Sequence, residues 1–547
     1  MSKNLHTKVT IKHVDFSLFN RMHLEGVMIE DQKHDTLMYA GEIRVNITDW
    51  FFFKKNAVLK NVAIDNAVIK FQRTDSVWSQ QFLFDYFAPS GAKKSSGGGI
   101  QFSLNKLIMN NVTFKKTDGW VGKDMVIYAG SLKLDADGLK FSGPQYKIKD
   151  LLVDQPVVVL KNYTGKRPRD TTAVTVAVDP DLPPSMEVWN TGNMLLQVDN
   201  LKINNGTFIN DKETKRGTFS YFDGQHILFT AVNADIKNAR LGGDSVIASL
   251  RLSAKERSGV EVKHLISDVK MTPQGMYFNK LDLLTNRSQI RDYFSMSYNG
   301  LWDMGDFVHK VKITGNMNGT SVNSDDIAFF APALASWKKT ISLKGRMKGT
   351  VADWTGRDLD IAAGNNTLLN GDITMTGLPD IRQTFIDFKA NNFSTTYEDA
   401  VTIVPAIRNV NKVELQKIRY VNFKGSFTGF VQDFVTFGTI STNLGTLTTD
   451  LNMKLPAKQD PVYSGNIATD NFMLGEFLGD KDLGAISMTG TVKGKGFTDK
   501  SLNTMLDGTI RFADYKNYRY NNITVKGKLD KKLFEGFTAI RDDNLHV

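Results

Sequence analysis

A pattern of nine residues constrains the fold of this chain more than any other feature of the sequence. It reads apolar-x-apolar-x-Gly-x-apolar-x-Gly and begins at Val311, Ile341, Val421 and Ile486. Alternate residues of a β-strand point to opposite faces, so the five marked positions of each copy share one face. The positions between them hold only Lys, Arg, Ser, Thr and Asn. The pattern therefore predicts four strands that are apolar on one face and polar on the other.

The glycines of this pattern lie on the apolar face. Glycine removes side-chain bulk there and lets a strand bend. A sheet with small residues along its apolar face can curl around something. We expect these glycines to set the curvature: Gly315, Gly319, Gly345, Gly349, Gly425, Gly429, Gly490 and Gly494.

The first 210 residues contain a different repeat. Four segments begin at Val62, Leu107, Leu151 and Leu201, at spacings of 45, 44 and 50 residues. Each reads apolar-x-apolar, then two turn formers, then an apolar residue at the eighth position. The turn formers are mostly Asp and Asn, which tolerate the turn conformations that join strands. We therefore expect these pairs to connect one strand to the next.

A second pair of similar segments supports this period. Leu37–Ile43 resembles Val126–Leu132, which lies 89 residues later, close to two periods. The repeats suggest three regions that we expect to belong to one continuous sheet. They are residues 1–210 with a period of about 45 residues, residues 211–310 as connecting β-structure, and residues 311–547 with the glycine repeat. Residues 91–99, with the sequence GAKKSSGGG, are expected to form a linker or loop.

The predicted fold is all-β. It is a long, twisted, mostly antiparallel sheet that curls into an elongated trough or β-helix-like rod with an apolar interior. The 35 Phe and 44 Gly residues beside only 13 Pro favour strands. Few short helices are expected. The candidates are Ser324–Lys338, in which Ser324 would be the cap, Gln80–Phe87 and Phe472–Leu478.

Sequence motifs of catalysis and cofactor binding are absent. The chain has no Cys, which excludes disulfides and thiol nucleophiles, and it lacks HExxH, Walker A, GxSxG and GxGxxG patterns. Its eight His residues do not show metal-ligand spacing, and Asp325–Asp326 is explained more simply by helix-start chemistry than by a bound cation. We therefore predict no enzyme, no catalytic residue, no metal and no cofactor. The formal net charge is +10, but the sequence does not contain clustered Arg residues with aromatic residues between them, so nucleic-acid binding is not expected.

The apolar face of the strands has two interpretations. It can pack against another sheet in a dry core, or it can line a groove for acyl chains, whose burial contributes about 0.8 kcal/mol per CH₂. In the second interpretation these residues line the groove: Ile43, Val45, Ile47, Leu132, Leu134, Val311, Ile313, Met317, Ile341, Leu343, Met347, Val421, Phe423, Phe427, Ile486, Met488 and Val492.

Several stretches resemble TamB proteins, and the version found in Bacteroidota looks most similar. The similarity follows the order of the chain over essentially its whole length. The stretches are Val14–Asn20, Leu24–Asp31, Asp35–Leu37, Asp326–Pro332, Thr367–Gly371, Gly377–Asp380, Gly494–Phe497 and Tyr515–Ile523.

The resemblance implies membership of the AsmA-like superfamily of long β-sheet proteins. Such proteins are anchored in the inner membrane of Gram-negative bacteria by an N-terminal helix and cross the periplasm to a BamA-like partner in the outer membrane. Their trough is thought to conduct phospholipids. This sequence lacks that helix and the family's C-terminal domain, so we expect a periplasmic fragment of a longer protein.

Two other functions remain open. An older proposal for the family is a scaffold or chaperone for outer-membrane protein assembly, which would bind unfolded strands through a sheet edge. An enzyme such as a β-helical polysaccharide lyase would need acidic and basic side chains clustered on one outward face. The polar face of the glycine repeats, made of Ser, Thr, Asn and basic residues, does not show such a cluster.

Overall fold

The computed structural model describes most of the chain, and every structural statement below refers to the described residues. These are residues 7–17, 21–47, 56–83, 101–140, 144–168, 188–332, 335, 338–403, 414–456, 459–497, 500–531 and 533–547. They form 28 strands that hold 68% of the residues, whereas short helices hold 7%. The predicted all-β class with few helices is therefore confirmed.

The chain divides into two compact units. The first comprises Met1–Gln289, Tyr298–Gly305 and Asp326–Ala333, and the second comprises Ile290–Ser297, Asp306–Asp325 and Leu334–Val547. The predicted boundary at residues 210–211 falls inside a strand, and the one at residues 310–311 falls directly before another. The predicted linker, residues 91–99, lies outside the described residues.

The first unit contains strands β1 to β14. Their bounds are β1 (Val9–Thr10), β2 (His13–Ser17), β3 (Arg21–Glu30), β4 (Thr36–Ile47), β5 (Asn56–Arg73), β6 (Gln101–Asp118), β7 (Lys123–Lys140), β8 (Gln145–Asp154), β9 (Val157–Asn162), β10 (Leu195–Lys212), β11 (His226–Gly242), β12 (Ser245–Glu256), β13 (Glu261–Thr272) and β14 (Gly275–Leu284).

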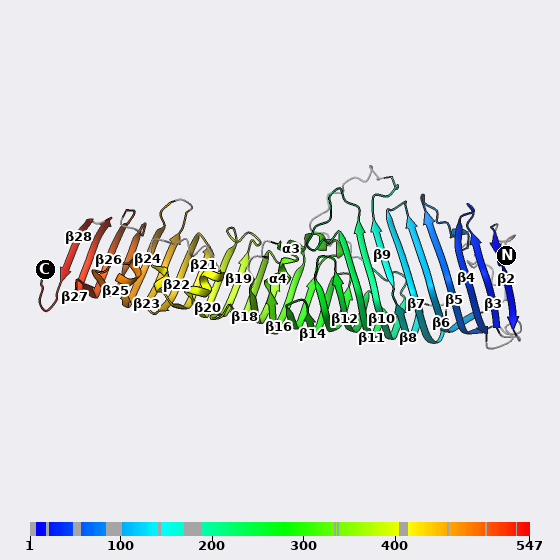
Figure 1. Ribbon diagram of the computed structural model, residues 1–547. Helices are drawn as coiled ribbons and strands as arrows, with labels where there is room; N and C mark the ends of the chain where they lie inside the picture. Colours follow the sequence, from blue (N-terminus) through cyan, green and yellow to red (C-terminus); the bar gives the residue numbers. More distant parts are fainter. Residues whose placement is uncertain are drawn as a thin grey trace. The chain divides into compact units, whose positions relative to one another are not determined.

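Most neighbours in this unit are antiparallel, and three pairs are parallel (Figure 1). β1 and β2 both pair with β3, and β3, β4 and β5 follow in order. β5 is then parallel to β6, and β10 is parallel to β8 and β9, which both lie antiparallel to β7. From β10 to β14 each strand is antiparallel to the next.

These parallel pairs contain the four repeated segments of the sequence. Val62 is paired with Leu107 and Ile69 with Phe114, so the first two segments lie side by side at an offset of one period. Leu151 is paired with Leu201 in the same way. The sequence repeat is therefore a repeat of parallel strands in register.

Three of the four pairs of turn formers lie inside strands and do not connect them, so the expectation was wrong for these three, whereas Asp154–Gln155 lies where β8 ends before β9. The second residue of each pair has a left-handed backbone, with φ of 55° at Asn66 and 50° at Asn111. The left-handed residue rotates the strand, so Ile64 and Ala67 pack into the same apolar cluster although they are an odd number of residues apart. The position is a bend inside the sheet.

The bend also explains the sequence similarity between Leu37–Ile43 and Val126–Leu132. Gly41 faces Asn66, and a Cβ on Gly41 would lie 3.2 Å from the Cβ of Asn66. A Cβ on Gly130 would lie 3.4 Å from the Cβ of Gln155, the left-handed residue between β8 and β9. Both glycines therefore leave room for a neighbouring left-handed residue.

The second unit contains strands β15 to β28. Their bounds are β15 (Gln289–Ser297), β16 (Lys312–Asn323), β17 (Thr340–Gly349), β18 (Asp353–Ala363), β19 (Thr367–Thr376), β20 (Phe385–Thr396), β21 (Tyr420–Phe430), β22 (Asp433–Thr442), β23 (Gly445–Lys454), β24 (Val462–Met473), β25 (Leu483–Lys495), β26 (Asn503–Tyr515), β27 (Tyr518–Asp530) and β28 (Leu533–Ile540).

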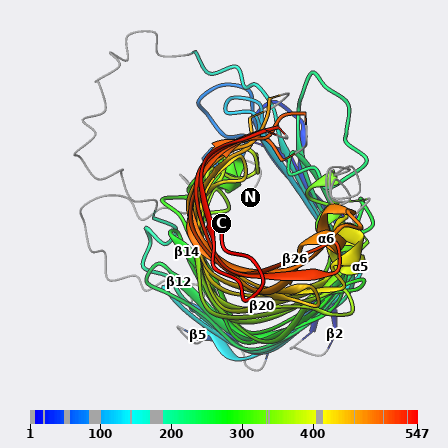
Figure 2. The same ribbon diagram turned by 90° about the vertical axis from the view of Figure 1, so that its left-hand side faces the viewer.

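From β16 to β28 every strand is antiparallel to the next one. Viewed end-on, β20 and β26 follow an arc, and two helices, α5 and α6, lie at one end of it (Figure 2). A short helix follows each of β16, β20 and β24. Apart from the helical residues 81–83, the helices that the structure describes are η2 (Leu301–Asp306), α3 (Phe307–Lys310), α4 (Ser324–Ala328), α5 (Tyr397–Ile403), η5 (Leu415–Lys417) and α6 (Leu474–Leu478).

The predicted helix Ser324–Lys338 is much shorter in the structure, since α4 ends at Ala328. Its cap is the side chain of Asn323, whose Oδ1 accepts a hydrogen bond from the Asp325 amide at 2.9 Å, while Ser324 Oγ instead accepts one from the Lys339 amide. That contact brings Lys339, directly before β17, back beside the first residue of α4, so the apolar spacing does not extend into a helix.

The other two helix predictions fared differently. α6 covers all of Phe472–Leu478 except its first two residues, which belong to β24. Of Gln80–Phe87, residues 81–83 are helical and residues 84–87 lie outside the described residues. Within the described residues, no helix combines the length and apolarity needed to cross a bilayer.

Candidate functional site

The apolar face of the second unit is organised in rows that run across the strands. One row passes through Phe393, Phe423 and Ile440, which are successive cross-strand partners on β20, β21 and β22. We call it the first apolar row. From β17 to β27 its members are Leu343, Ile361, Leu369, Phe393, Phe423, Ile440, Leu447, Thr469, Met488, Ile510 and Ile523.

A second apolar row runs parallel to the first, four residues away along β21. Phe388 is paired with Phe427 there, and the ring of Phe427 stacks on that of Phe434 at a centroid distance of 4.7 Å. From β17 to β26 its members are Met347, Gly356, Ile373, Phe388, Phe427, Thr436, Leu451, Gly465, Val492 and Leu506.

Small residues fill the line between the two rows. Ala390, Gly425, Gly438 and Thr449 are successive partners from β20 to β23. A Cβ on Gly425 would lie 3.0 Å from Cζ of Phe423, so the phenyl ring covers the glycine. The small residues thereby let large apolar side chains lie flat on the backbone.

Exposure differs between these lines. Ala390 and Thr449 each keep only 3% of their surface exposed, whereas Phe423 and Phe427 are half-buried. A small residue is this buried where flanking side chains close over it, as they do on the concave side of a bent strand. The flanking side chains themselves keep some exposed surface, so this face is not packed like the interior of a closed sandwich.

Most of the predicted lining residues of the second unit fall on these rows. Leu343, Phe423 and Met488 belong to the first row, and Met347, Phe427 and Val492 to the second. Ile341, Val421, Ile486 and Ile313 lie on the same face beside the rows. The glycines Gly345, Gly425 and Gly490 occupy the line of small residues, Gly315 continues the second row, and Gly349, Gly429 and Gly494 lie beyond it.

Three predicted residues depart from the pattern. Val311 precedes β16 and is fully buried, and Met317 is also buried, so neither offers open surface. Gly319 is exposed and has a left-handed φ of 68°, because the register shifts between Met317 and Thr320. It therefore does not share the apolar face.

The predicted residues of the first unit lie on β4 and β7. Ile43 packs against a buried cluster formed by Val27, Ala40, Ala67 and Val112. Leu134 packs against a second buried cluster, while Val45 and Leu132 are half-buried. The side chain of Ile47 lies outside the described residues.

Sequence reasoning missed several members of the two rows, including Phe388, Phe393, Ile440 and Leu451. Phe388 and Ala390 alternate as expected for one face, but the register shifts before Phe393 and breaks the period. The alternation of Phe434, Thr436, Gly438 and Ile440 was a usable signal for β22.

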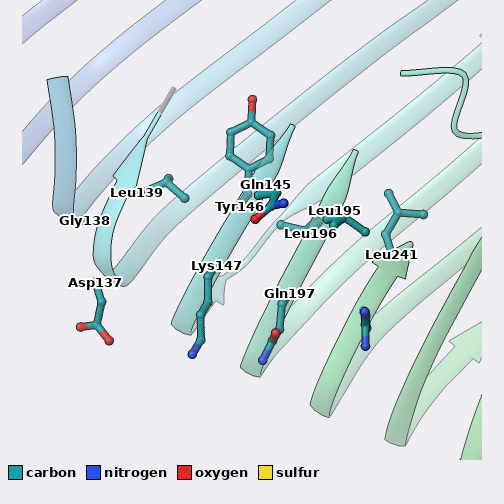
Figure 3. A pocket seen from close by; sticks show the side chains of 11 residues that line it. Asp137, Gly138, Leu139, Gln145, Tyr146, Lys147, Leu195, Leu196, Gln197 and Leu241 are labelled. Atoms are coloured by element: carbon teal, nitrogen blue, oxygen red, sulfur yellow. The ribbon is translucent and has the colours of Figure 1, made fainter. Parts of the chain in front are cut away.

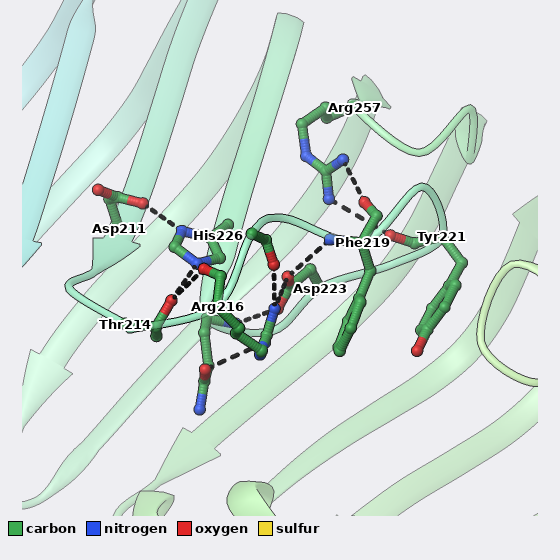
Figure 4. A network of polar contacts seen from close by, with 10 residues as sticks. Asp211, Thr214, Arg216, Phe219, Tyr221, Asp223, His226 and Arg257 are labelled. Atoms are coloured by element: carbon green, nitrogen blue, oxygen red, sulfur yellow. Dashed lines mark hydrogen bonds and ion pairs between the residues drawn. The ribbon is translucent and has the colours of Figure 1, made fainter.

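A polar network in the first unit fixes the loop between β10 and β11 (Figure 4). Asp223 is buried and accepts hydrogen bonds from Arg216 Nη1 at 2.7 Å and Nη2 at 2.8 Å. The Arg216 guanidinium holds the pKa of Asp223 well below its usual range. Arg257 donates to the carbonyl oxygens of Phe219 and Tyr221. Every member of this network bonds within the loop and its neighbours, which indicates a structural role.

A hollow of about 440 Å³ lies at the ends of β7, β8, β10 and β11 (Figure 3). Leu139 and Tyr146 point to one side of the sheet and belong to an apolar cluster, whereas Asp137 and Lys147 point to the other side. The described residues contain no group of three or more His, Asp or Glu side chains that could hold a metal ion.

Two carboxylates hold short helices against neighbouring hairpins. Asp399, the third residue of α5, accepts hydrogen bonds from the amides of Asn365 at 3.1 Å and Asn366 at 2.5 Å. Burial raises its pKa, but these amide bonds outweigh that effect and leave the pKa lowered. Asp326, the third residue of α4, accepts in the same way from the amides of Arg287 and Ser288. These bonds give Asp326 a structural role, and its neighbour Asp325 pairs with Lys338.

Comparison with known proteins identifies no relative. No protein-family model, curated protein or solved structure matches the chain. The resemblance to TamB proteins therefore stays a prediction from the sequence, and the geometry of the apolar rows carries the functional argument.

Proposed function

We propose that the apolar face of the second unit binds the acyl chains of phospholipids and lets them pass from strand to strand. In this proposal the chain is a segment of a lipid-transfer bridge in the periplasm of a Gram-negative bacterium. It moves phospholipids between the inner and outer membranes and catalyses no reaction.

The observation that carries the proposal is the pair of cross-strand apolar rows. The first row crosses from β17 to β27, a path of about 48 Å at the usual strand spacing. Thr469 is its one polar member. An acyl chain on this path meets apolar side chains at almost every strand, so no position holds it in place.

The energetics favour occupancy of such a face by lipid. Burial of each CH₂ group contributes about 0.8 kcal/mol, so even a partly covered acyl chain gains several kcal/mol. Half-buried side chains such as Phe423 and Leu343 keep exposed apolar surface that an acyl chain can cover. The polar residues between them on each strand face the other way and keep the outer surface in water.

The sequence resemblance to TamB proteins supports the proposed periplasmic location and the proposed phospholipid cargo. That family is thought to carry phospholipids along an apolar trough between the two membranes. The alternative function, a scaffold for outer-membrane protein assembly, requires contacts at a sheet edge and does not require a long apolar path within the sheet.

A photoreactive amino acid placed at single positions in living cells tests the proposal. At Ile440, on the first apolar row, we expect cross-links to phospholipid. At Ser441, the next residue, the side chain faces the polar side opposite Asn422, and we expect none. Equal lipid cross-linking at both positions, or none at Ile440, would contradict the proposal.

A further inference from the structure

The polar face of the second unit contains two adjoining hollows. One of about 730 Å³ spans β18 to β23, and its lining includes Asp372, Asp387, Lys389, Lys424, Ser426 and Phe437. The other, of about 660 Å³, spans β16 to β20, and its lining includes Ser342, Lys344, Asp360, Leu368 and Asn370. Both volumes lie in the range of ~300–1,000 Å³ that is typical of small-ligand sites.

The two hollows meet at a pair of asparagines. Asn391 lines the larger hollow, and its Nδ2 donates a hydrogen bond at 3.2 Å to Oδ1 of Asn370, which lines the smaller one. We call the two hollows together the outer groove. Because it crosses β16 to β23 on one face, it suits an extended polymer better than a compact ligand.

Each hollow has one large, strongly exposed apolar side chain beside its charged and hydroxyl side chains. Phe437 is 60% exposed in the larger hollow, and Leu368 is 52% exposed in the smaller one. Ser426 lies directly opposite Phe437, and Lys389 lies opposite Ser426 on the next strand. The phenyl ring is therefore a flat apolar platform beside hydrogen-bonding side chains.

The carboxylates of the larger hollow are held by partners on the sheet. Asp372 accepts hydrogen bonds from Arg357 at 3.0 Å and from the Asp358 amide at 2.9 Å. Asp387 accepts one from Thr428 Oγ1 at 3.0 Å. Such fixed acceptors lose little conformational entropy when they bind a ligand.

The chemistry of the groove selects a neutral, hydroxyl-rich ligand. Asp372 and Asp387 repel a polyanion and largely offset Arg357, Lys389 and Lys424. A lipid tail would lie against charged side chains here, such as Lys344, Asp360 and Lys424. Sugar rings match both features, since each hydroxyl can donate and accept, and the C–H face of the ring can stack on phenylalanine.

We infer that the outer groove binds a neutral, linear polysaccharide, with successive sugar rings lying across successive strands. The strand spacing of about 4.8 Å is close to the length of one sugar residue in an extended β-1,4-linked chain. This inference does not depend on the proposed lipid function, because Phe437, Leu368 and the charged side chains of the groove lie on the face opposite the apolar rows.

Isothermal titration calorimetry of the full chain with chitohexaose and cellohexaose tests the inference. We expect at least one of them to bind, and Phe437→Ser to weaken its binding about tenfold through loss of the stacking platform. Phe437 is exposed, so this change is not expected to affect folding. The matched control is Phe537→Ser, since Phe537 is also 60% exposed on the polar face but lines neither hollow.

Three results would overturn the inference. They are no heat of binding with either hexasaccharide, equal weakening by Phe437→Ser and Phe537→Ser, and displacement of the bound sugar by polyphosphate in a salt-dependent way. The last result would instead assign the groove to a polyanion.

Discussion

Gly425 and Gly438 face each other across β21 and β22 on the apolar side of the second unit. A Cβ on Gly425 would lie 2.1 Å from the carbonyl oxygen of Phe437 and 2.7 Å from the Cα of Gly438. The backbone of both glycines has a positive φ, 157° and 149°. The two strands therefore approach each other in a way that only glycine permits.

This relationship predicts that Gly425→Ala destabilises the second unit. The methyl group clashes with backbone atoms, and the backbone must leave a conformation that costs other residues about 1–3 kcal/mol. Thermal unfolding followed by circular dichroism should show a clear drop in the midpoint. Gly217→Ala is the control, because a Cβ there meets no atom within 4 Å. An equal effect of both changes would contradict the role assigned to Gly425.

Substitution of the two phenylalanines of β21 distinguishes a lipid-lined face from a dry core. Replacing Phe423 and Phe427 together with Asp should abolish lipid binding and leave the circular dichroism spectrum intact, because both side chains already have partial access to the surface. The control is Tyr420→Asp, which places the same charge on the polar face of the same strand, where Tyr420 is 42% exposed.

The control should keep its lipid. If the double variant unfolds, the two residues belong to a dry core, since buried unpaired charges are very costly. If the double variant stays folded and keeps its full lipid load, the assignment of the groove is wrong.

The carboxylate of Asp399 should contribute to stability in a pH-dependent way. Its folded pKa is lowered, so its contribution is present above the unfolded pKa of about 3.9 and is lost as the pH falls through the folded pKa. Asp399→Asn should lower the free energy of unfolding at pH 7 by about 1–3 kcal/mol, because it weakens the bonds that the buried Asp399 accepts from the amides of Asn365 and Asn366.

The difference between Asp399→Asn and the unchanged protein should shrink in acid, as denaturant titrations at pH 7 and at low pH would show. Asp433→Asn is the control, because its ion pair with Lys454 is exposed and contributes little. A difference that is the same at both pH values would contradict the assignment of the effect to the charge of Asp399.

The left-handed backbone of Asn111 can be tested by two substitutions. With φ at 50°, Asn111→Val should strain the backbone by about 1–2 kcal/mol relative to Asn111→Gly, which adopts this conformation freely. Both variants lose the side-chain bonds to Asn66 and Tyr128, so the comparison isolates the backbone. Equal thermal midpoints of the two variants would show that the bend does not depend on this conformation.

The sequence identified the strands best where strict alternation continues through a whole element. In β17, Ile341 and Leu343 lie on the apolar face, and Ser342 and Lys344 lie on the other face, as the period of two predicts. It failed where a register shift breaks that period. Phe393 was missed because two asparagines separate it from Ala390, and a single sequence does not show how the next strand absorbs the extra residue.

The pairing of strands that are far apart in the sequence was the other feature that could not be predicted. The repeat at Val62 and Leu107 was visible in the sequence, but its 45-residue spacing does not say that the two copies are parallel neighbours. That arrangement depends on cross-strand contacts such as the 2.6 Å hydrogen bond from Asn110 Nδ2 to Asp65 Oδ1. The Asx pairs were read as turns because the same residues also favour the left-handed backbone inside a strand.

The lipid content of the purified protein tests the central claim most directly. The chain would be purified without detergent and extracted with organic solvent, and the extract would be analysed by quantitative mass spectrometry. The apolar rows predict several phospholipids per chain. A well-folded sample that carries none would contradict the proposed lipid path and favour the scaffold for outer-membrane protein assembly.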